Sequence, residues 1–247
     1  MIRRLLAFLA FLAFLAALAV LPAAAQYTNT LNGRQFNNMY AANADFLMSQ
    51  MIQQGQWNVM RLAMEQQVAK QRAAQQAGRK AAPAAPAAKS VTYKYPLSAT
   101  DFKPAGARNV PQQLGAAVGN PKDRADFEKA CREILQAIEA TPGFRKNNVA
   151  AAMTVLLGVS LQVVNRGEIP GDASQELMRG LNDQVAALPV FAGLPAERRT
   201  QFYDTMVIVG GLIAGIAQSA AESNNRELAA LAQQMAKDAL AQFGVKS

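Results

Sequence analysis

The chain has 247 residues, 51% of them hydrophobic, and a formal net charge of +8. It contains no histidine and a single cysteine, Cys131. The lack of histidine excludes Ser-His-Asp and Cys-His catalytic sites and removes the most common zinc ligand. A single cysteine cannot form an intramolecular disulfide, so we expect packing alone to stabilise the fold.

Residues 1–25 have the composition of a cleavable secretory signal peptide. Arg3 and Arg4 make a positive start, residues 5–21 are uncharged and apolar, and residues 23–25 are alanines of the size that signal peptidase accepts. An uncleaved membrane anchor is the alternative, since the apolar run reaches the lower limit for crossing a bilayer. We predict cleavage after the alanines and a periplasmic or secreted mature chain without a transmembrane helix.

Residues 26–80 are predicted to form a helical extension. Apolar side chains recur near helical spacing over residues 36–55 and again over 57–68. Methionine side chains are flexible and suit surfaces that adapt to a partner, although a helix–helix seam is the alternative use of such a stripe. The residues predicted to contact a partner are Met39, Met48, Met51, Trp57, Met60 and Met64.

Residues 81–100 are predicted to be a basic, Ala/Pro-rich linker. The run AAPAAPAAK at 81–89 has two prolines and no apolar period. The basic residues in and before it have no acidic neighbours, which favours contact with an anionic surface; a merely solvated linker is the alternative. The residues predicted to make that contact are Lys70, Arg72, Arg79, Lys80, Lys89 and Lys94. A short β-like run at 91–95 is expected to lie against the helical domain, since one strand makes no sheet.

Residues 101–247 are predicted to be a globular helical domain. Asn120 and Pro121 have the pattern of an N-cap and a first helical residue, and Gly167 is expected to end a helix in the left-handed conformation. Asp172 with Gln175 is expected to cap the start of the next helix. The predicted helices are a short one from Pro111, 121–141, 147–166, 172–188, one beginning at Pro195, and 226–243.

The two most apolar segments, 149–164 and 206–217, are predicted to be the central helices of an all-α bundle. The second contains Gly210, Gly211 and Gly215. Glycine costs about 1 kcal/mol against alanine inside a helix, so we expect these positions to allow close approach by a neighbouring backbone.

Motifs for catalysis and ligand binding are absent from the chain. No serine precedes a lysine by three positions, and neither the Walker nor the dinucleotide glycine loop can be written. We therefore predict no catalytic residue, no cofactor and no metal. An enzyme that uses only carboxylates remains open, because glycosidases work with two acids. Glu222 and Ser223 are faintly similar to the Glu-Ser pair of lytic transglycosylases, but a polar loop is the better interpretation.

Short motifs lie along the helical domain at 102–104 (FKP), Arg108, Pro111, Leu114, 147–150 (NNVA), 165–167 (NRG) and 199–203 (RTQFY). In these motifs the chain resembles an uncharacterised family of secreted bacterial proteins, a domain of unknown function, over residues 101–247. The resemblance implies a helical exported domain. It implies no activity and no catalytic residue.

The sequence favours an exported, non-enzymatic helical protein that binds another component of the cell envelope. The partner is predicted to be an envelope protein or an anionic surface polymer rather than a nucleic acid, because the exported chain is moderately basic. Two alternatives are a cell-wall-acting hydrolase or lyase that uses only acids, and a membrane-active protein that inserts segments 149–164 and 206–217. The sequence does not decide the oligomeric state.

Overall fold

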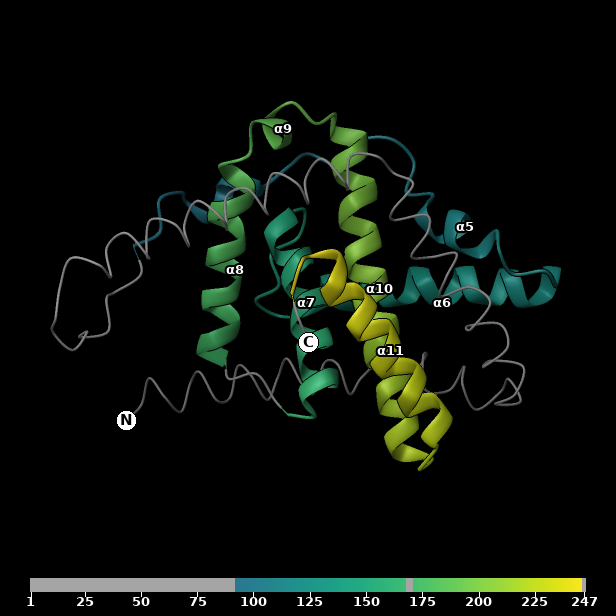
Figure 1. The fold of residues 1–247 in the computed structure, drawn as a ribbon. Coiled ribbons are helices and arrows are strands. Elements are labelled where there is room, and N and C mark those ends of the chain that lie inside the picture. The colour runs from purple at the N-terminus through teal and green to yellow at the C-terminus, as the bar shows by residue number, and fades with distance from the viewer. Residues whose placement is uncertain (1–91, 168–170, 246–247) are drawn as a thin grey trace, which may run out of the picture.

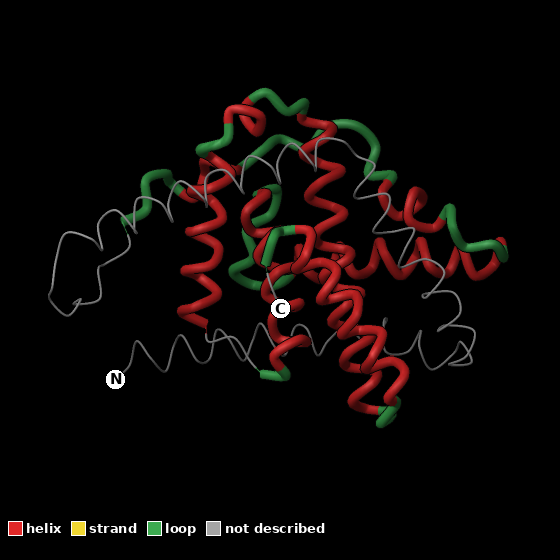
Figure 2. Tube along the Cα trace, in the orientation of Figure 1, coloured by secondary structure: helices red, strands yellow, loops and turns green. Residues whose placement is uncertain are grey.

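The computed structural model describes residues 92–167 and 171–245, which form an all-α bundle (Figures 1 and 2). In chain order the elements are η1 (Leu97–Thr100), α5 (Val110–Gly115), α6 (Pro121–Ala140), α7 (Val149–Asn165), α8 (Gly171–Ala186), α9 (Pro189–Ala192), α10 (Ala196–Glu222) and α11 (Arg226–Gln242). Within these ranges no strand is present, and the predicted all-α class is confirmed. The predicted signal peptide and helical extension lie outside the described residues.

Helices α7 and α10 are the centre of the bundle, as their apolar composition predicted. They pack on each other; α7 also packs on α8 and α11, and α10 packs on α6 and α11. Every residue of α10 from Tyr203 to Ile213 is buried. A helix buried around its whole circumference has no need of a polar face, which explains the uncharged middle of both segments. Figure 1 shows α8 at one edge of the bundle and α6 extending to the other.

Among the described residues, α10 is the one helix long and apolar enough to cross a membrane by length and composition. In its most apolar 18-residue window, 78% of the residues are buried inside the bundle. The apolar surface of α10 is therefore occupied by its neighbours in this structure.

Gly210 and Gly211 of α10 lie in close contact with neighbouring helices, with backbone at Gly210, as predicted, and with a side chain at Gly211. A Cβ on Gly210 would lie 3.1 Å from the Leu156 Cα of α7, and a Cβ on Gly211 would lie 2.3 Å from the Ile134 Cγ2 of α6. The first contact is with backbone and the second with a β-branched side chain, so neither neighbour can move away easily. These glycines set the spacing of the three helices.

Local signals fix most helix ends. The Asn120 side chain accepts hydrogen bonds from the first turn of α6, with Pro121 as the first helical residue, as predicted. The Asn148 side chain caps α7 by accepting from the Ala151 amide, and Asn225 caps α11. Such caps satisfy amide groups that have no partner within the helix.

Two residues predicted to cap helices do not have that role in the structure. The residue that ends α7 in the left-handed conformation is Arg166, with φ of 51°, and not Gly167. The Gly167 amide donates to the Gln162 carbonyl, which closes the helix one residue earlier than predicted. Helix α8 already includes Gly171, so Asp172 lies inside the first turn instead of at the predicted cap position.

Cys131 is fully buried on α6, and burial raises the pKa of its thiol well above the ordinary value. The protonated thiol is a weak nucleophile. The structure thus places Cys131 in the core, on the same buried face of α6 as Phe127, Ile134 and Ile138.

We predict that Gly211→Ala destabilises the protein by about 1–3 kcal/mol, because the added methyl group overpacks the contact with Ile134. Gly158→Ala in α7 is the matched control. Its Cβ would meet nothing within 4 Å, so alanine should raise stability by about 0.5–1 kcal/mol through helix propensity. Urea denaturation followed by circular dichroism measures both changes, and a destabilisation of the same size in both variants would contradict the close-approach argument.

Candidate functional site

Residues 92–109, which we call the strap, cross the bundle from α8 to α10 before entering α5. The strap has no regular structure apart from η1. It is held by side-chain hydrogen bonds to residues far away in the sequence, at three places along its length. The helices themselves pack through a continuous apolar core. Four of the buried polar side chains of the bundle, those of Asn148, Asn182, Thr200 and Asp204, are hydrogen-bonded to the strap.

The first attachment is on α8. The Asp183 carboxylate accepts from the Lys94 amide at 2.6 Å and from the Tyr95 amide at 2.9 Å. The Asn182 amide donates to the carbonyls of Tyr95, at 3.4 Å, and Pro96, at 3.0 Å, and its oxygen accepts from the Thr100 hydroxyl. Residues 94–96, near the end of the predicted linker, are thus bound to α8. The β-like run at 91–95 was expected to lie against the helical domain in this way.

The second attachment joins the strap to the start of α7. Arg145 donates two hydrogen bonds to the Asp101 carboxylate, at 2.7 and 2.5 Å. Asn148 donates to the same carboxylate at 2.7 Å and to the Leu97 carbonyl at 2.8 Å. Hydrogen bonding from Arg145, with a smaller contribution from Asn148, holds the pKa of Asp101 below its ordinary value although partial burial opposes the shift.

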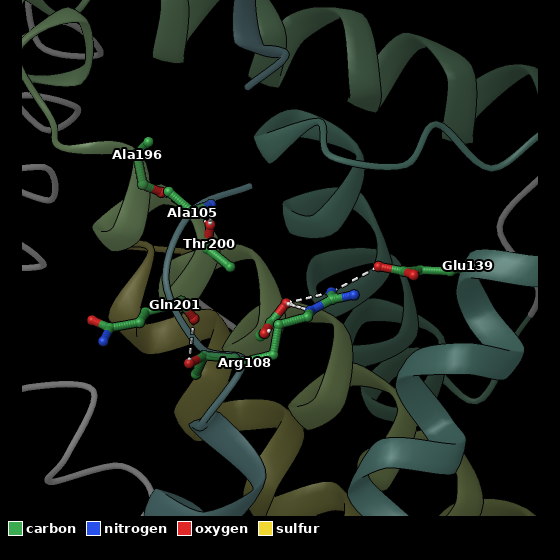
Figure 3. Close-up of polar contacts among 8 residues, drawn as sticks. Ala105, Arg108, Glu139, Ala196, Thr200 and Gln201 are labelled. Atoms are coloured by element: carbon green, nitrogen blue, oxygen red, sulfur yellow. Dashed lines mark hydrogen bonds and ion pairs between the residues drawn. The ribbon is translucent and has the colours of Figure 1, made fainter. Parts of the chain in front are cut away.

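The third attachment joins the strap to α10 and α6. Arg108 donates to both oxygens of Asp204, with distances of 2.5–3.1 Å, and to Glu139 at 2.7 Å. Figure 3 shows the Arg108 guanidinium reaching toward Glu139, with Thr200 beside Ala105 further along the strap. The Thr200 hydroxyl accepts from the Ala105 amide and itself donates to a carbonyl of its own helix.

Burial dominates the electrostatics of this third attachment. The Asp204 side chain is 0% exposed, that of Glu139 is 15% exposed and that of Arg108 is 37% exposed. Burial raises the pKa of Asp204, while the hydrogen bonds and charge of Arg108 oppose that rise. Both carboxylates raise the pKa of Arg108 although its own burial opposes the shift. An ionised Asp204 thus costs stability, and Arg108 offsets part of that cost.

Tyr203 lies beneath the Arg108 guanidinium, whose central carbon is 5.8 Å from the ring centroid. Phe102 of the strap meets the same ring edge-on at 5.6 Å. The Tyr203 hydroxyl is buried close to the Asn147 backbone and the Glu139 carboxylate. Burial, with the nearby charge of Glu139, raises its pKa. The Tyr203 ring is the surface on which Phe102 and Arg108 of the strap pack.

This arrangement does not have the form of an acid–base catalytic pair. A carboxylate with a raised pKa beside a second carboxylate is the composition that acid-only hydrolases use. Here, however, both oxygens of Asp204 accept from Arg108 and the side chain is inaccessible to solvent. Within residues 92–167 and 171–245 no group of three potential metal-binding side chains occurs. The geometry is that of a structural clamp.

Of the residues predicted from sequence to bind a partner or an anionic surface, only Lys94 is among the described ones. Its side chain is exposed, with the ammonium 5.3 Å from the Tyr95 ring centroid, while its amide is held by Asp183. The other five basic residues, the five methionines and Trp57 lie outside the described residues. Glu222 is exposed at the end of α10 and accepts from Gln218, and the Ser223 hydroxyl donates to its own helix.

The sequence did not reveal that a set of residues holds the strap. Arg108 and Asn148 were noted only as parts of the motifs that carry the family resemblance, and no role was predicted for them. An available signal was Asp204, a charged residue beside the apolar segment 206–217, because a buried charge requires a partner. Its partner Arg108 is 96 positions earlier, and no spacing rule identifies it.

Fold and site together define an all-α bundle closed by a polar strap. The chain belongs to a family of unknown function, DUF6683, whose sequence profile matches residues 3–247. The match extends well before residue 101, where the resemblance seen in the sequence began. No curated protein and no solved structure shows significant similarity to the chain.

We predict that Arg108→Ala lowers the free energy of unfolding by about 3 kcal/mol, because it leaves the Asp204 carboxylate buried without its partner. Adding Asp204→Asn should recover part of the loss, since a neutral amide costs less to bury than a charge. Urea denaturation of both variants measures these changes. Arg132→Ala is the control: Arg132 is exposed, and its pair with the partly buried Glu128, at 3.6 Å, should contribute less than about 1 kcal/mol. If Arg108→Ala and Arg132→Ala lowered the free energy of unfolding equally, the stabilising role of the Arg108–Asp204 pair would be refuted.

We predict that the contribution of Asp101 to stability disappears in acid. Because the folded-state pKa of Asp101 lies below its ordinary value of 3.8, its stabilisation is present above that pH and is lost as the pH falls through the folded-state pKa. The difference in unfolding free energy between wild type and Asp101→Asn should be constant from neutral pH down to about 4 and shrink below it. Both side chains of the Asp101–Arg145 pair are more than a third exposed, so the difference should stay below about 1 kcal/mol. A difference independent of pH in urea titrations would contradict this assignment.

Proposed function

We propose that this protein is an exported, non-enzymatic component of a bacterial cell envelope. In this proposal the helical bundle is a rigid base, and residues 26–91 form an arm that binds another envelope component. The signal-like composition of residues 1–25 supports export. The methionines and Trp57 of the arm supply apolar contact area, and its basic residues supply attraction to an anionic partner.

The observation that carries the proposal is that the chain is bound to the bundle directly after the arm, at residues 94 and 95. The chain enters the described region at Thr92, and within three residues its amides are bound by Asp183 on α8. Further attachments hold the strap at Asp101 and Arg108. Because the chain is fixed to the bundle at this end, fewer conformations are lost there when the arm binds a partner.

The polar residues of the bundle support a binding role over catalysis. Asp204 and Glu139 already accept from Arg108, and Asp101 accepts from Arg145 and Asn148. Each of these carboxylates therefore has a structural partner that accounts for its position. Among the described residues, none of these clusters presents the free acid and base that hydrolysis of a glycoside requires.

We predict that a photo-crosslinking amino acid at position 57, replacing Trp57, captures an envelope component in intact cells. The same amino acid at position 234, replacing the exposed Gln234 of α11, is the control and should capture little. Adducts would be identified by mass spectrometry of the separated envelope fractions. Equal capture at the two positions, or no adduct at position 57, would contradict a role for the arm.

A second set of variants distinguishes the effect of the positive charges in the arm from the effect of the total charge of the protein. The arm variant replaces five basic residues by glutamine: Lys70, Arg72, Arg79, Lys80 and Lys89. The matched bundle variant replaces five exposed basic residues in the same way: Lys122, Lys129, Lys146, Arg226 and Lys237. Both lose the same formal charge, so only the arm variant should show weaker crosslinking at position 57 if the basic residues of the arm attract the partner.

A further inference from the structure

The strap end of the bundle, where residues 92–109 cross the end of α8 and the starts of α7 and α10, carries three exposed lysines (Figure 1). Lys94 leaves the strap beside α8, to which its amide is bound. Further along, the Phe102 amide of the strap donates to the Asn147 carbonyl, just before α7 begins. Lys103 and Lys146 adjoin this hydrogen-bonded pair on its two chains, so they leave the surface from neighbouring positions.

These lysines have no acidic partner. Among the described residues, none of the three ammonium groups forms an ion pair. The carboxylates near the strap accept hydrogen bonds from arginine side chains or from strap amides: Asp101, Glu139, Asp183 and Asp204. Glu197, at the start of α10, is exposed and is followed by the exposed Arg198. The acidic groups of the strap end therefore leave the charge of the lysines unbalanced.

Lysines on the outer surfaces of α6 and α11 have acidic neighbours instead. Lys129 lies 3.8 Å from Glu133, one turn further along α6. Lys237 of α11 is followed directly by Asp238. Exposed like charges repel each other over about 10 Å at 0.1 M ionic strength, and a partner of opposite charge offsets that repulsion. The strap end, unlike these helix surfaces, is suited to an anionic partner.

The placement of the lysines indicates an extended partner. They leave from separate points of the strap end and do not converge on one position, so a flat array of negative charges can meet all three while a single small anion cannot. Anionic lipid headgroups form such an array, and each nearby lysine strengthens binding to it by about five-fold. Among the described residues, Val245 is the one large hydrophobic side chain that is exposed. Contact through charge is therefore favoured over insertion.

We propose that Lys94, Lys103 and Lys146 form a surface by which the strap end of the bundle rests on an anionic lipid bilayer. The three side chains contact phosphate-bearing headgroups while the strap stays attached to the bundle, because they are already exposed. This contact needs neither the arm nor the envelope component that the arm is proposed to bind, so it goes beyond the function proposed above.

The test measures binding of the mature full-length chain to vesicles by sedimentation. Vesicles of phosphatidylcholine with phosphatidylglycerol are anionic, and vesicles of phosphatidylcholine alone are neutral. The strap-end variant carries Lys94→Gln, Lys103→Gln and Lys146→Gln. It should bind the anionic vesicles about ten-fold more weakly than the wild type does, or weaker still. Wild-type binding that is absent, or that does not depend on phosphatidylglycerol, would overturn the proposal.

The matched control replaces three other exposed lysines by glutamine: Lys122, Lys129 and Lys237. Both variants lose the same formal charge, so equal weakening in the two would mean that only total charge matters, and the proposal would fail. In the arm variant defined above, the strap-end substitutions should weaken vesicle binding by the same factor. Loss of the crosslink at position 57 with vesicle binding retained would contradict the role of the arm alone.

Two further measurements identify the kind of contact. Raising the ionic strength from about 0.1 M to about 1 M shortens the screening length from about 10 Å to about 3 Å, so bound protein should leave the vesicles. Protein that stays bound would indicate insertion and would contradict contact through charge. Soluble polyphosphate supplies phosphate groups without a bilayer. Binding to polyphosphate but not to anionic vesicles would assign the surface to an anionic polymer and would overturn the proposal.

Discussion

The buried carboxylate of Asp204 is the constraint on which the strap depends. It lies fully buried at the start of the apolar middle of α10, where the loss of hydration raises its pKa. A charge in that position is tolerated only with a partner of opposite sign and good geometry. Arg108 is that partner, and it comes from the strap. The chain before α5 must therefore pass over α10, and residues 92–109 are part of the folded domain.

Two kinds of interaction have separate roles in this molecule. Apolar packing holds the helices together, with Gly210 and Gly211 allowing α10 to approach α7 and α6 closely. Hydrogen bonds and ion pairs hold the strap on that bundle. Phe102 of the strap also packs against the core, where its ring meets that of Tyr203. The strap is therefore held by both kinds of interaction and is part of the folded bundle.

Local sequence signals were enough to predict the longer helices, whereas the short α9 was not predicted. Asn120 followed by Pro121 marked the start of α6, and the proline at 195 marked the start of α10, because caps and prolines act within one turn. The end of α7 shows the limit of such signals. Gly167 was the expected left-handed residue, yet Arg166 adopts that conformation, and nothing in the structure explains why the helix ends one residue early.

By itself, the sequence determined the all-α class, the order of the helices and the identity of the two central ones. Periodicity and apolar composition are properties of contiguous residues, so they can be read along the chain. Only the tertiary structure decided how the strap is held. Arg108 and Asp204 are 96 positions apart, and Asp183 binds the amide of Lys94 from 89 positions away. Such hydrogen bonds join single residues from distant segments, and they leave no repeating pattern in the sequence.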